Sequence, residues 1–348
     1  MIALRLLGAL FAVGLFLVSL YRYPKRQISR LNLIISWVIG VAIVVLAIAP
    51  NLFNPIFDAF NFRPGGQRRL LAVELFAIIV LFALIVRNMS FTDVSIRSIR
   101  DLTEALAVQA FDWERADEIP EGRRIVVISP AYNEAENVGA VIAELPEEID
   151  GLRVVPVVID DGSEDSTSDE ARKAGALVAR LPIRRGGGLA LRVGYELAVR
   201  LGAEVVVSID ADGQHVPDEM PLLVRPILEG DADLVNGSRL LGDFQRESVV
   251  RHIGVHFFSW VVTIATGQRI TDPSNGYRAT RPEILKRLSL DEDQFWASEL
   301  LIEALRTRAR ITEVPITIRA RQAGQSKKPK SLKYGWHFAK AIIKTWLK

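Results

Sequence analysis

The chain contains 348 residues, of which 49% are hydrophobic and 24% are charged, and its formal net charge at pH 7 is +2. This near-neutral balance gives no global basic field and argues against a nucleic-acid partner. The absence of cysteine excludes a disulfide framework and zinc held by cysteine. The hydrophobic fraction is high for a soluble protein with this many charges, and the excess is concentrated before residue 90.

Three apolar segments near the N-terminus predict membrane-spanning helices, at residues 2–21, 31–49 and 70–86. The second segment carries no charge and has close to the roughly 20 residues that a spanning helix needs. A signal peptide is the alternative interpretation of the first segment. It is disfavoured because no small-x-small cleavage site follows and two further apolar segments do.

The basic residues around these segments predict the orientation of the chain, because cytoplasmic loops carry an excess of Lys and Arg. Those that fill the first loop are Arg22, Lys25, Arg26 and Arg30, and those that follow the third segment are Arg87, Arg97 and Arg100. We therefore expect a multi-pass protein of the cell membrane, with everything after Val86 on the cytoplasmic face.

The expected organisation has four parts. They are a membrane domain with three spans over 1–88, a juxtamembrane helical connector over 89–121, a catalytic domain over 122–328 and a basic amphipathic interfacial helix over 329–348. In the last part, lysines alternate with aromatic and aliphatic residues, a pattern that fits the surface of an anionic leaflet. Packing of its aromatic stripe against the catalytic domain is the alternative.

From Arg124 onward, short runs of β-forming residues alternate with helical segments. The predicted strands are 125–128, 154–159, 176–179 and 205–209, and the predicted helices are 135–145, 166–173, 189–201 and 217–228. This alternation predicts an α/β domain with a mostly parallel sheet that is covered on both faces. In such sheets, ligands bind beyond the carboxyl ends of the strands.

Two acids one residue apart, Asp210 and Asp212, follow the apolar run that ends at Ile209. Carboxylates at a strand end suit a hard divalent cation shared with substrate phosphates. They therefore indicate an enzyme that holds a nucleotide diphosphate through Mg²⁺ or Mn²⁺. The alternative is that these acids only form a turn or cap a helix.

Polar clusters follow two other predicted strands. Tyr132 could stack on a nucleobase and Glu134 could accept hydrogen bonds from base or ribose, although Asn133 or Glu134 could instead cap the next helix. Asp161 could accept from a base N–H, although Asp-Gly turns are common. The glycines at 186–188 precede a helix and suit close approach of a phosphate or sugar, with a flexible loop as the alternative.

The order of these motifs resembles the inverting family 2 glycosyltransferases, and within them the dolichol-phosphate mannosyltransferases and bacterial polyprenyl-phosphate glycosyltransferases. The motifs that carry the resemblance, over residues 123–330, are PAYNE at 130–134, DDGS at 160–163, GLALRVG at 188–194, DADGQHVP at 210–217, NGSR at 236–239, DPSNGYR at 272–278, EVPI at 313–316 and RQAGQSK at 321–327. The resemblance implies a glycosyltransferase-A-type fold behind an N-terminal membrane domain of uncharacterised role.

The resemblance also implies a role for each matching residue. The nucleoside would be bound by Pro130, Tyr132, Glu134 and Asp161, and the nucleotide sugar also by Asp210, Ala211 and Asp212. The metal, Mg²⁺ or Mn²⁺, would be held by Asp210, Asp212 and Gln214. Arg239 would bind the acceptor phosphate, and Arg321, Ser326 and Lys327 would bind phosphates from a closing loop. The catalytic set would be Asp212, Arg239, Arg321 and Lys327.

Two departures from the family pattern qualify this expectation. The family often has Arg-x-x-Ser before a membrane-facing helix, whereas Gly254 stands three residues after Arg251, so an acceptor contact from that serine is in doubt. Many relatives carry spanning helices after the catalytic domain, whereas the apolar segments here precede it. The absence of a Gln-x-x-Arg-Trp motif argues for transfer of a single sugar.

These observations predict a membrane-bound glycosyltransferase that moves one sugar, such as mannose or glucose, from a nucleotide-diphosphate sugar to polyprenyl phosphate with inversion. Two alternatives are transfer to another membrane lipid, such as a diacylglycerol, and a non-catalytic nucleotide-sugar-binding assembly partner. Further expected partners are a flippase or a second copy of the chain.

Overall fold

The computed structural model describes residues 2–22, 30–49, 55, 81, 84, 95–242, 259–260, 262–264, 267–290 and 296–320. The chain divides into two compact units, Met1–Val94 and Ser95–Lys348. The boundary falls within the predicted connector of residues 89–121, so part of that connector belongs to the larger unit.

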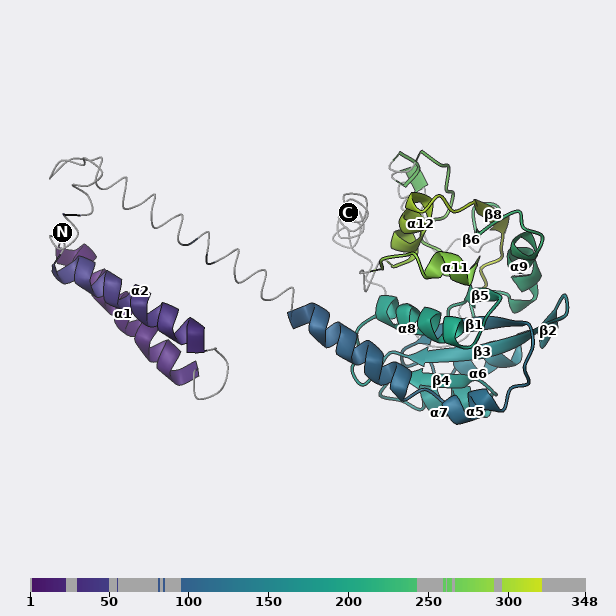
Figure 1. The fold of residues 1–348 in the computed structure, drawn as a ribbon, viewed down its shortest axis with the longest axis horizontal. Coiled ribbons are helices and arrows are strands. Elements are labelled where there is room, and N and C mark those ends of the chain that lie inside the picture. The colour runs from purple at the N-terminus through teal and green to yellow at the C-terminus, as the bar shows by residue number, and fades with distance from the viewer. Residues whose placement is uncertain are drawn as a thin grey trace. The chain divides into compact units, whose positions relative to one another are not determined.

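Two long helices, α1 (Ile2–Arg22) and α2 (Arg30–Ile48), pack side by side in the N-terminal unit (Figure 1). The ring of Phe16 meets Trp37 edge to face, with 5.6 Å between ring centroids. The indole Nε1 of Trp37 donates a hydrogen bond to Ser19 Oγ at 3.1 Å. Gly40 allows this close approach, because a Cβ there would lie 2.7 Å from the Phe16 ring.

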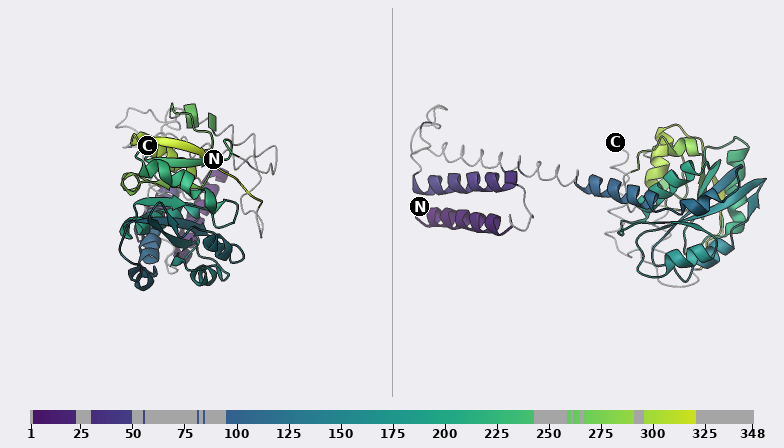
Figure 2. Two further views of the ribbon diagram at one scale, coloured as in Figure 1. Left: turned by 90° about the vertical axis from the view of Figure 1, so that its right-hand side faces the viewer. Right: turned by 60° about the horizontal axis from the view of Figure 1, so that its bottom comes forward.

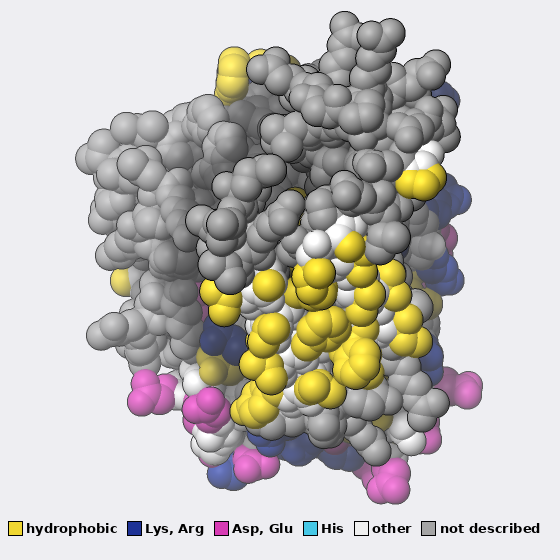
Figure 3. All heavy atoms as spheres, turned by 90° about the vertical axis from the view of Figure 1, so that its left-hand side faces the viewer, with side chains coloured by type: hydrophobic (Ala, Val, Ile, Leu, Met, Phe, Trp, Pro, Cys, Tyr) yellow, Lys and Arg dark blue, Asp and Glu magenta, His cyan; other side chains and the backbone are white. Residues whose placement is uncertain are grey.

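Both helices expose large hydrophobic side chains. The most exposed are Leu10, Phe11, Leu17, Tyr21, Ile34, Val38 and Ile48, each more than half accessible, and Figure 3 shows a broad hydrophobic patch on the face that it views. Among the described residues, however, no helix combines the length and hydropathy needed to cross a membrane. The predicted three-span domain is therefore not confirmed, and most of its third segment, like residues 329–348, lies outside the described residues.

The larger unit is built on an eight-stranded sheet among its described residues. Its strands are β1 (Arg124–Ala131), β2 (Glu148–Ile149), β3 (Leu152–Asp160), β4 (Leu177–Arg180), β5 (Val205–Ser208), β6 (Leu234–Ser238), β7 (Arg278–Thr280) and β8 (Ile311–Pro315). They lie in the order β2-β3-β1-β5-β7-β6-β8, with β4 also paired to β3. The pairs β1·β3, β1·β5, β3·β4 and β6·β8 are parallel.

Helices cover both faces of the sheet (Figure 2). The helices of this unit are α5 (Trp113–Asp117), α6 (Val138–Ala143), α7 (Thr167–Lys173), α8 (Gly187–Arg200), the short 3₁₀ helix η2 (Pro217–Glu219), α9 (Met220–Leu228), α11 (Pro282–Leu285) and α12 (Trp296–Arg306). Side chains of α8 and α12 share one core with Val126 and Ile128 of β1. Side chains of α9 share another core with Ile125 and Val127, on the opposite face of β1.

The continuous apolar run of β1 explains why this strand lies inside the sheet. A strand buried on both faces is expected to be continuously apolar, and the run from Ile125 to Ile128 has no accessible surface. Gly194 on α8 brings that helix close to the sheet, because a Cβ there would lie 2.9 Å from Ile159 and 3.2 Å from Ile128. Burial of these aliphatic side chains is the main favourable contribution to folding of the unit.

The predicted strands and helices of residues 124–228 are found, with two differences. The helix predicted at 135–145 is the shorter α6, because residues 135–137 form a turn before the helix begins at Val138. The sheet is mixed rather than mostly parallel, since β7 is inserted between β5 and β6 and runs antiparallel to both.

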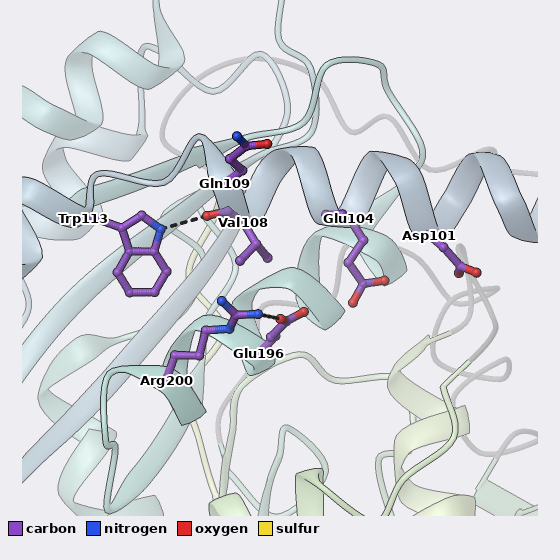
Figure 4. A pocket seen from close by; sticks show the side chains of 8 residues that line it. Asp101, Glu104, Val108, Gln109, Trp113, Glu196 and Arg200 are labelled. Atoms are coloured by element: carbon purple, nitrogen blue, oxygen red, sulfur yellow. Dashed lines mark hydrogen bonds and ion pairs between the residues drawn. The ribbon is translucent and has the colours of Figure 1, made fainter.

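A helix over residues 95–109 precedes α5 and packs on the core through Thr103, Ala107 and Val108. Between this helix and α8 lies a cavity of about 530 Å³. Figure 4 shows its carboxylates, Asp101, Glu104 and Glu196, on the two facing helices, with Arg200 paired to Glu196 at 2.5 Å. Burial raises the pKa of the Glu104 carboxyl above its ordinary value, against the opposing charge of Arg192.

This shift predicts that Glu104→Gln stabilises the protein at neutral pH. A raised pKa means that the folded state disfavours the ionised carboxylate, so Gln removes a cost that is present above the ordinary pKa of 4.5. We expect the melting temperature to rise by about 1–3 °C at pH 7, the scale for one partly exposed charge in a domain of this size. The difference should vanish below pH 4.5, where the carboxyl is protonated in both states. Melting curves from pH 4 to pH 8 test this expectation, and a gain that persists at pH 4 would contradict it.

Candidate active site

The carboxyl ends of β1, β3 and β5 meet at one edge of the sheet. Ala131 at the end of β1 pairs in register with Asp160 at the end of β3, and Ile128 pairs with Ser208 at the end of β5. The three polar clusters that follow these strands in the sequence are therefore neighbours in space. This confirms the expectation that they converge on one side of the domain.

The loops after β1 and β3 are joined by hydrogen bonds. The backbone N–H of Asn133 donates to Ser163 Oγ at 2.9 Å, and Asn133 Oδ1 accepts from the N–H of Glu164 at 2.8 Å. The N–H of Glu134 donates to Thr167 Oγ1 at 2.9 Å. These side chains thus tie the two loops together instead of capping α6, whose N-cap residue makes no side-chain capping bond.

Pro130, Tyr132 and Glu134, predicted to bind the nucleoside, lie in this joined region. Pro130 is the penultimate residue of β1 and Tyr132 follows the strand. Glu134 is only 9% exposed, and its Oε2 accepts a hydrogen bond from Asn137 Nδ2 at 2.8 Å. Glu134 therefore has a structural contact within the loop in addition to the ligand contact predicted for it.

Asp161 anchors the loop that leads into α8. Its Oδ1 accepts from the N–H of Arg185 at 2.7 Å and its Oδ2 accepts from the N–H of Gly186 at 2.8 Å. Burial nevertheless raises the pKa of Asp161, and these two hydrogen bonds oppose the shift. The carboxylate predicted to receive a base N–H is thus already bonded to two backbone amides.

The same loop places Arg184 over Tyr132. The guanidinium carbon of Arg184 lies 3.8 Å from the centroid of the tyrosine ring, a cation–π contact. Gly162, with φ of +70°, permits this arrangement, because a Cβ there would lie 2.8 Å from the backbone N of Arg184. The ring face predicted to stack on a base is therefore covered by the Arg184 guanidinium, which a base would have to displace.

The glycine motif forms the start of α8. Gly186 is the N-cap residue and has a φ of 105°, which an L-residue rarely adopts. Gly187 lies close to Trp296 at the start of α12, since a Cβ there would be 3.1 Å from the indole Nε1. These positions require glycine for packing and turn geometry, and they also leave backbone N–H groups at the helix start, which suit an anionic ligand.

Asp210, Ala211 and Asp212 follow β5 directly. Asp212 Oδ1 accepts from the N–H of Gln214 at 3.2 Å, and Asp210 Oδ2 lies 3.7 Å from His215 Nε2. The Asp210 side chain is 31% exposed, whereas Ala211 is buried. The Asp-x-Asp segment thus turns at the sheet edge and keeps the Asp210 carboxylate accessible.

Gly276 packs against this carboxylate from the neighbouring loop. A Cβ at Gly276 would lie 2.8 Å from Asp210 Oδ1 and 3.1 Å from Trp296. The segment after Asp212 is held by residues near β8, because the N–H of Arg319 donates to Gln214 O at 2.8 Å and Gln214 Nε2 donates to Arg319 O at 3.4 Å. The orientation of the acidic segment is therefore fixed from both sides.

The residues predicted to hold a metal suit a hard divalent cation. Within the described part of the chain, no three His, Cys, Asp or Glu side chains form a metal site by themselves. Asp210, Asp212 and Gln214 supply two carboxylates and an amide from one short segment. A cation such as Mg²⁺ usually completes such a set with substrate phosphate and water oxygens, so the donor chemistry fits.

Arg239, predicted to bind the acceptor phosphate, is paired with a buried acid. Its Nε donates to Asp272 Oδ2 at 2.6 Å and its Nη2 donates to Asp272 Oδ1 at 3.0 Å. The Arg239 side chain is 12% exposed and Asp272 is fully buried. Arg239 is therefore a pre-positioned cation and not a solvent-facing one.

The remaining predicted residues, Arg321, Ser326 and Lys327, lie outside the described residues. Conversely, the structure adds polar groups for which no role was predicted. These are Asp160, whose Oδ1 accepts from the N–H of Ser163 at 2.7 Å, and four residues of one hydrogen-bonded network, the buried Asp272 and Arg278 and the half-buried Ser274 and Glu313. All of them lie in motifs that carry the family resemblance, and that was the only signal available in the sequence.

A mixed α/β sheet with an acidic pair beyond a central strand, beside a helix that starts with glycines, defines a glycosyltransferase-A-like domain. Comparison with known proteins identifies its family. Residues 126–292 match the model of "Glycosyl transferase family 2", and the chain belongs to this family. It is a glycosyltransferase.

Several curated relatives share this domain. An undecaprenyl-phosphate mannosyltransferase of Micrococcus luteus is 32% identical over 59% of this chain and 87% of the relative. A dolichyl-phosphate hexose transferase of Haloferax volcanii is 30% identical over 58% of this chain and 86% of the relative. Among solved structures, the glucosyl-3-phosphoglycerate synthase of Mycobacterium tuberculosis in complex with Mn²⁺, UDP and glucosyl-3-phosphoglycerate is 27% identical, with a TM-score of 0.52 over 67% of this chain and 81% of that one.

Proposed function

We propose that this glycosyltransferase moves a single sugar from a nucleotide-diphosphate sugar to polyprenyl phosphate, with inversion at the anomeric carbon. The observation that carries the proposal is the convergence of Tyr132, Asp161 and the Asp210–Asp212 segment at one sheet edge. The names of the relatives support the choice of acceptor, since they include undecaprenyl-phosphate and dolichyl-phosphate transferases. The sugar itself, mannose, glucose or a related hexose, is left to experiment.

The donor would bind along this edge. Tyr132 and the loop anchored by Asp161 would hold the nucleoside, and Asp210, Ala211 and Asp212 would face the diphosphate and sugar. Asp210, Asp212 and Gln214 would hold Mg²⁺ or Mn²⁺, which when bound would neutralise charge on the diphosphate leaving group. The solved structures of the M. tuberculosis relative with UDP and Mn²⁺ or Mg²⁺ support this choice of metals.

The acceptor would need little activation. A phosphate monoester is already anionic near neutral pH, so it can attack the anomeric carbon without a strongly activated general base. The residues of the site would then act mainly by positioning the two substrates and by stabilising charge. Arg239 would face the acceptor phosphate, and Arg321, Ser326 and Lys327 would contribute further phosphate contacts.

A polyprenyl phosphate is a lipid, so the reaction would take place at a membrane surface. The exposed hydrophobic side chains of α1 and α2 and the apolar composition of the first 90 residues support contact of the N-terminal unit with lipid. The distribution of basic residues supports the cytoplasmic side for the catalytic unit. We also propose the four parts predicted from the sequence, namely a membrane domain, a connector, a catalytic domain and an interfacial helix at 1–88, 89–121, 122–328 and 329–348.

The direct test incubates the purified full-length chain in detergent with radiolabelled GDP- and UDP-sugars, undecaprenyl or dolichyl phosphate, and Mn²⁺ or Mg²⁺. We expect a labelled lipid product that EDTA abolishes and that excess divalent metal restores. Diacylglycerol and free glycerol phosphate serve as competing acceptors. Labelling of diacylglycerol in preference to polyprenyl phosphate, or no lipid product with any common donor, would refute the proposal.

A further inference from the structure

We propose that Asp272 and Glu313 are positioning residues that fix the side chain of Arg239 for the acceptor phosphate. The inference deepens the proposed function and rests on its assignment of Arg239. It gives a role to Asp272 and Glu313, which lie in the motifs DPSNGYR at 272–278 and EVPI at 313–316 and for which no ligand role was predicted. The two motifs lie far apart in the sequence and meet through hydrogen bonds that the half-buried Glu313 accepts.

First, Asp272 holds the Arg239 side chain by two hydrogen bonds. The two hydrogen bonds of 2.6 and 3.0 Å from Nε and Nη2 are bidentate, and Nη2 also donates to Ser274 Oγ at 2.9 Å. A bidentate pair fixes the plane of the guanidinium as well as its place. These contacts use Nε and Nη2, and under this proposal the acceptor phosphate would bind at the Nη1 edge.

Second, Glu313 holds the segment that carries Asp272 by hydrogen bonds to its backbone. Glu313 Oε2 accepts from the N–H of Thr271 at 2.7 Å, and Oε1 accepts from the N–H of Asp272 at 3.2 Å. Glu313 Oε1 also accepts from Asn236 Nδ2 at 2.8 Å. One carboxylate on β8 therefore holds two successive amides next to the ion pair and a side chain of β6.

The third step ties this segment to the interior of the sheet. Asn236 Nδ2 also donates to Asp272 O at 3.0 Å, and Asn236 Oδ1 accepts from Arg278 Nε at 2.7 Å. The fully buried Arg278 donates in turn to Pro273 O at 3.0 Å and to Ala297 O. Backbone groups of residues 271, 272 and 273 are thus all bonded to the half-buried Glu313 or to the buried Asn236 and Arg278, which leaves this segment little freedom to move.

This arrangement matters for binding because a long basic side chain loses rotamer freedom when it is ordered by a ligand. Because the network already orders the Arg239 side chain in the folded protein, this conformational entropy is lost on folding and not when the acceptor binds. Replacing the Glu313 carboxylate by an amide would set an NH₂ group against a backbone N–H or the Asn236 amide. The segment would then loosen, Asp272 would shift, and Arg239 would lose its fixed orientation.

The test compares Glu313→Gln with the wild-type full-length chain. We expect the KM for polyprenyl phosphate to rise about tenfold, while the Kd for nucleoside diphosphate with Mn²⁺ stays within about twofold. Glu303→Gln is the matched control, because Glu303 is a buried glutamate on α12 that pairs with Arg306 at 2.8 Å. Equal losses in both constants, or an unchanged KM, would overturn the proposal.

Two further measurements distinguish a failure of the positioning role of Glu313 from a failure of the proposed function. In chain labelled with ¹⁵N-arginine and assigned through Arg239→Lys, the Arg239 Nε–H signal should exchange slowly in the wild type and rapidly in Glu313→Gln. If Glu313→Gln does not fold, Asp272→Asn provides the same comparison at the residue that bonds directly to Arg239. Absence of any transfer to polyprenyl phosphate by the wild type would refute the proposed function and the acceptor role, and the Nε–H signal would still decide whether Glu313 positions Arg239.

Discussion

Replacing Asp212 with asparagine is expected to reduce sugar transfer by roughly 10²–10³-fold, the scale for losing one group that stabilises charge in a transition state. The reason lies in charge and not in shape. Asparagine keeps an oxygen that can accept the N–H of Gln214, the contact that Asp212 makes at 3.2 Å. It loses the negative charge that a divalent cation and its bound diphosphate would require. Initial rates with saturating donor and acceptor in Mn²⁺ measure the effect.

The matched control is Asp218→Asn, which removes the same charge from an exposed residue of η2 six positions later. We expect its transfer rate to stay within about twofold of the wild type, and both variants to melt within about 2 °C of it, as is usual for surface changes. The affinity of Asp212→Asn for Mn²⁺ and nucleoside diphosphate together should fall. Turnover near the wild-type rate would refute the metal assignment of Asp212.

The donor side of this site could be predicted because its information is local. Each cluster directly follows an apolar run, so the strand and the position of its end are both visible in the sequence. The parallel register of β1 with β3 and β5 then brings Tyr132, Asp161 and Asp210 to one edge without further assumptions. The sequence around Asp161 could not show that its carboxylate accepts from the amides of Arg185 and Gly186, because that contact depends on the path of the loop before α8.

The acceptor side could not be predicted in the same way because its contacts are distant in sequence. A lone arginine usually faces solvent, and nothing near Arg239 indicates that Asp272 will pair with it. The pairing depends on β7, which runs antiparallel between β5 and β6 and places residues 271–278 beside the end of β6. The strand pattern of residues 124–228 gave no sign of this insertion.

The N-terminal unit shows a different limit of sequence patterns. Apolar runs predicted three spans, and the described residues include two long helices with many exposed hydrophobic side chains. Among the described residues no helix has the length and hydropathy needed to cross a membrane. Most of the third apolar segment lies outside the described residues, so the prediction of three spans is not confirmed.

The second large effect is expected for stability, where Arg278→Leu should lower the free energy of unfolding by about 3–5 kcal/mol. Arg278 is 1% exposed and donates to Asn236 Oδ1, Pro273 O and Ala297 O. Burial lowers the pKa of its guanidinium to about 10, so the group remains charged at pH 7. Leucine would fill part of the space but leave three buried acceptors without this donor.

Urea unfolding of the full-length chain, followed by tryptophan fluorescence, measures this cost. Arg200→Leu is the control, because Arg200 is 53% exposed and its partner Glu196 is 36% exposed on the same helix α8. An exposed pair of this kind contributes about 0–1 kcal/mol. If both variants lost stability equally, the buried hydrogen bonds of Arg278 would contribute no more to the free energy of unfolding than an exposed ion pair, which would contradict the prediction. A loss confined to Arg278→Leu would show that the segment carrying Asp272 is held mainly from the protein interior, where Arg278 donates to the carbonyl of Pro273.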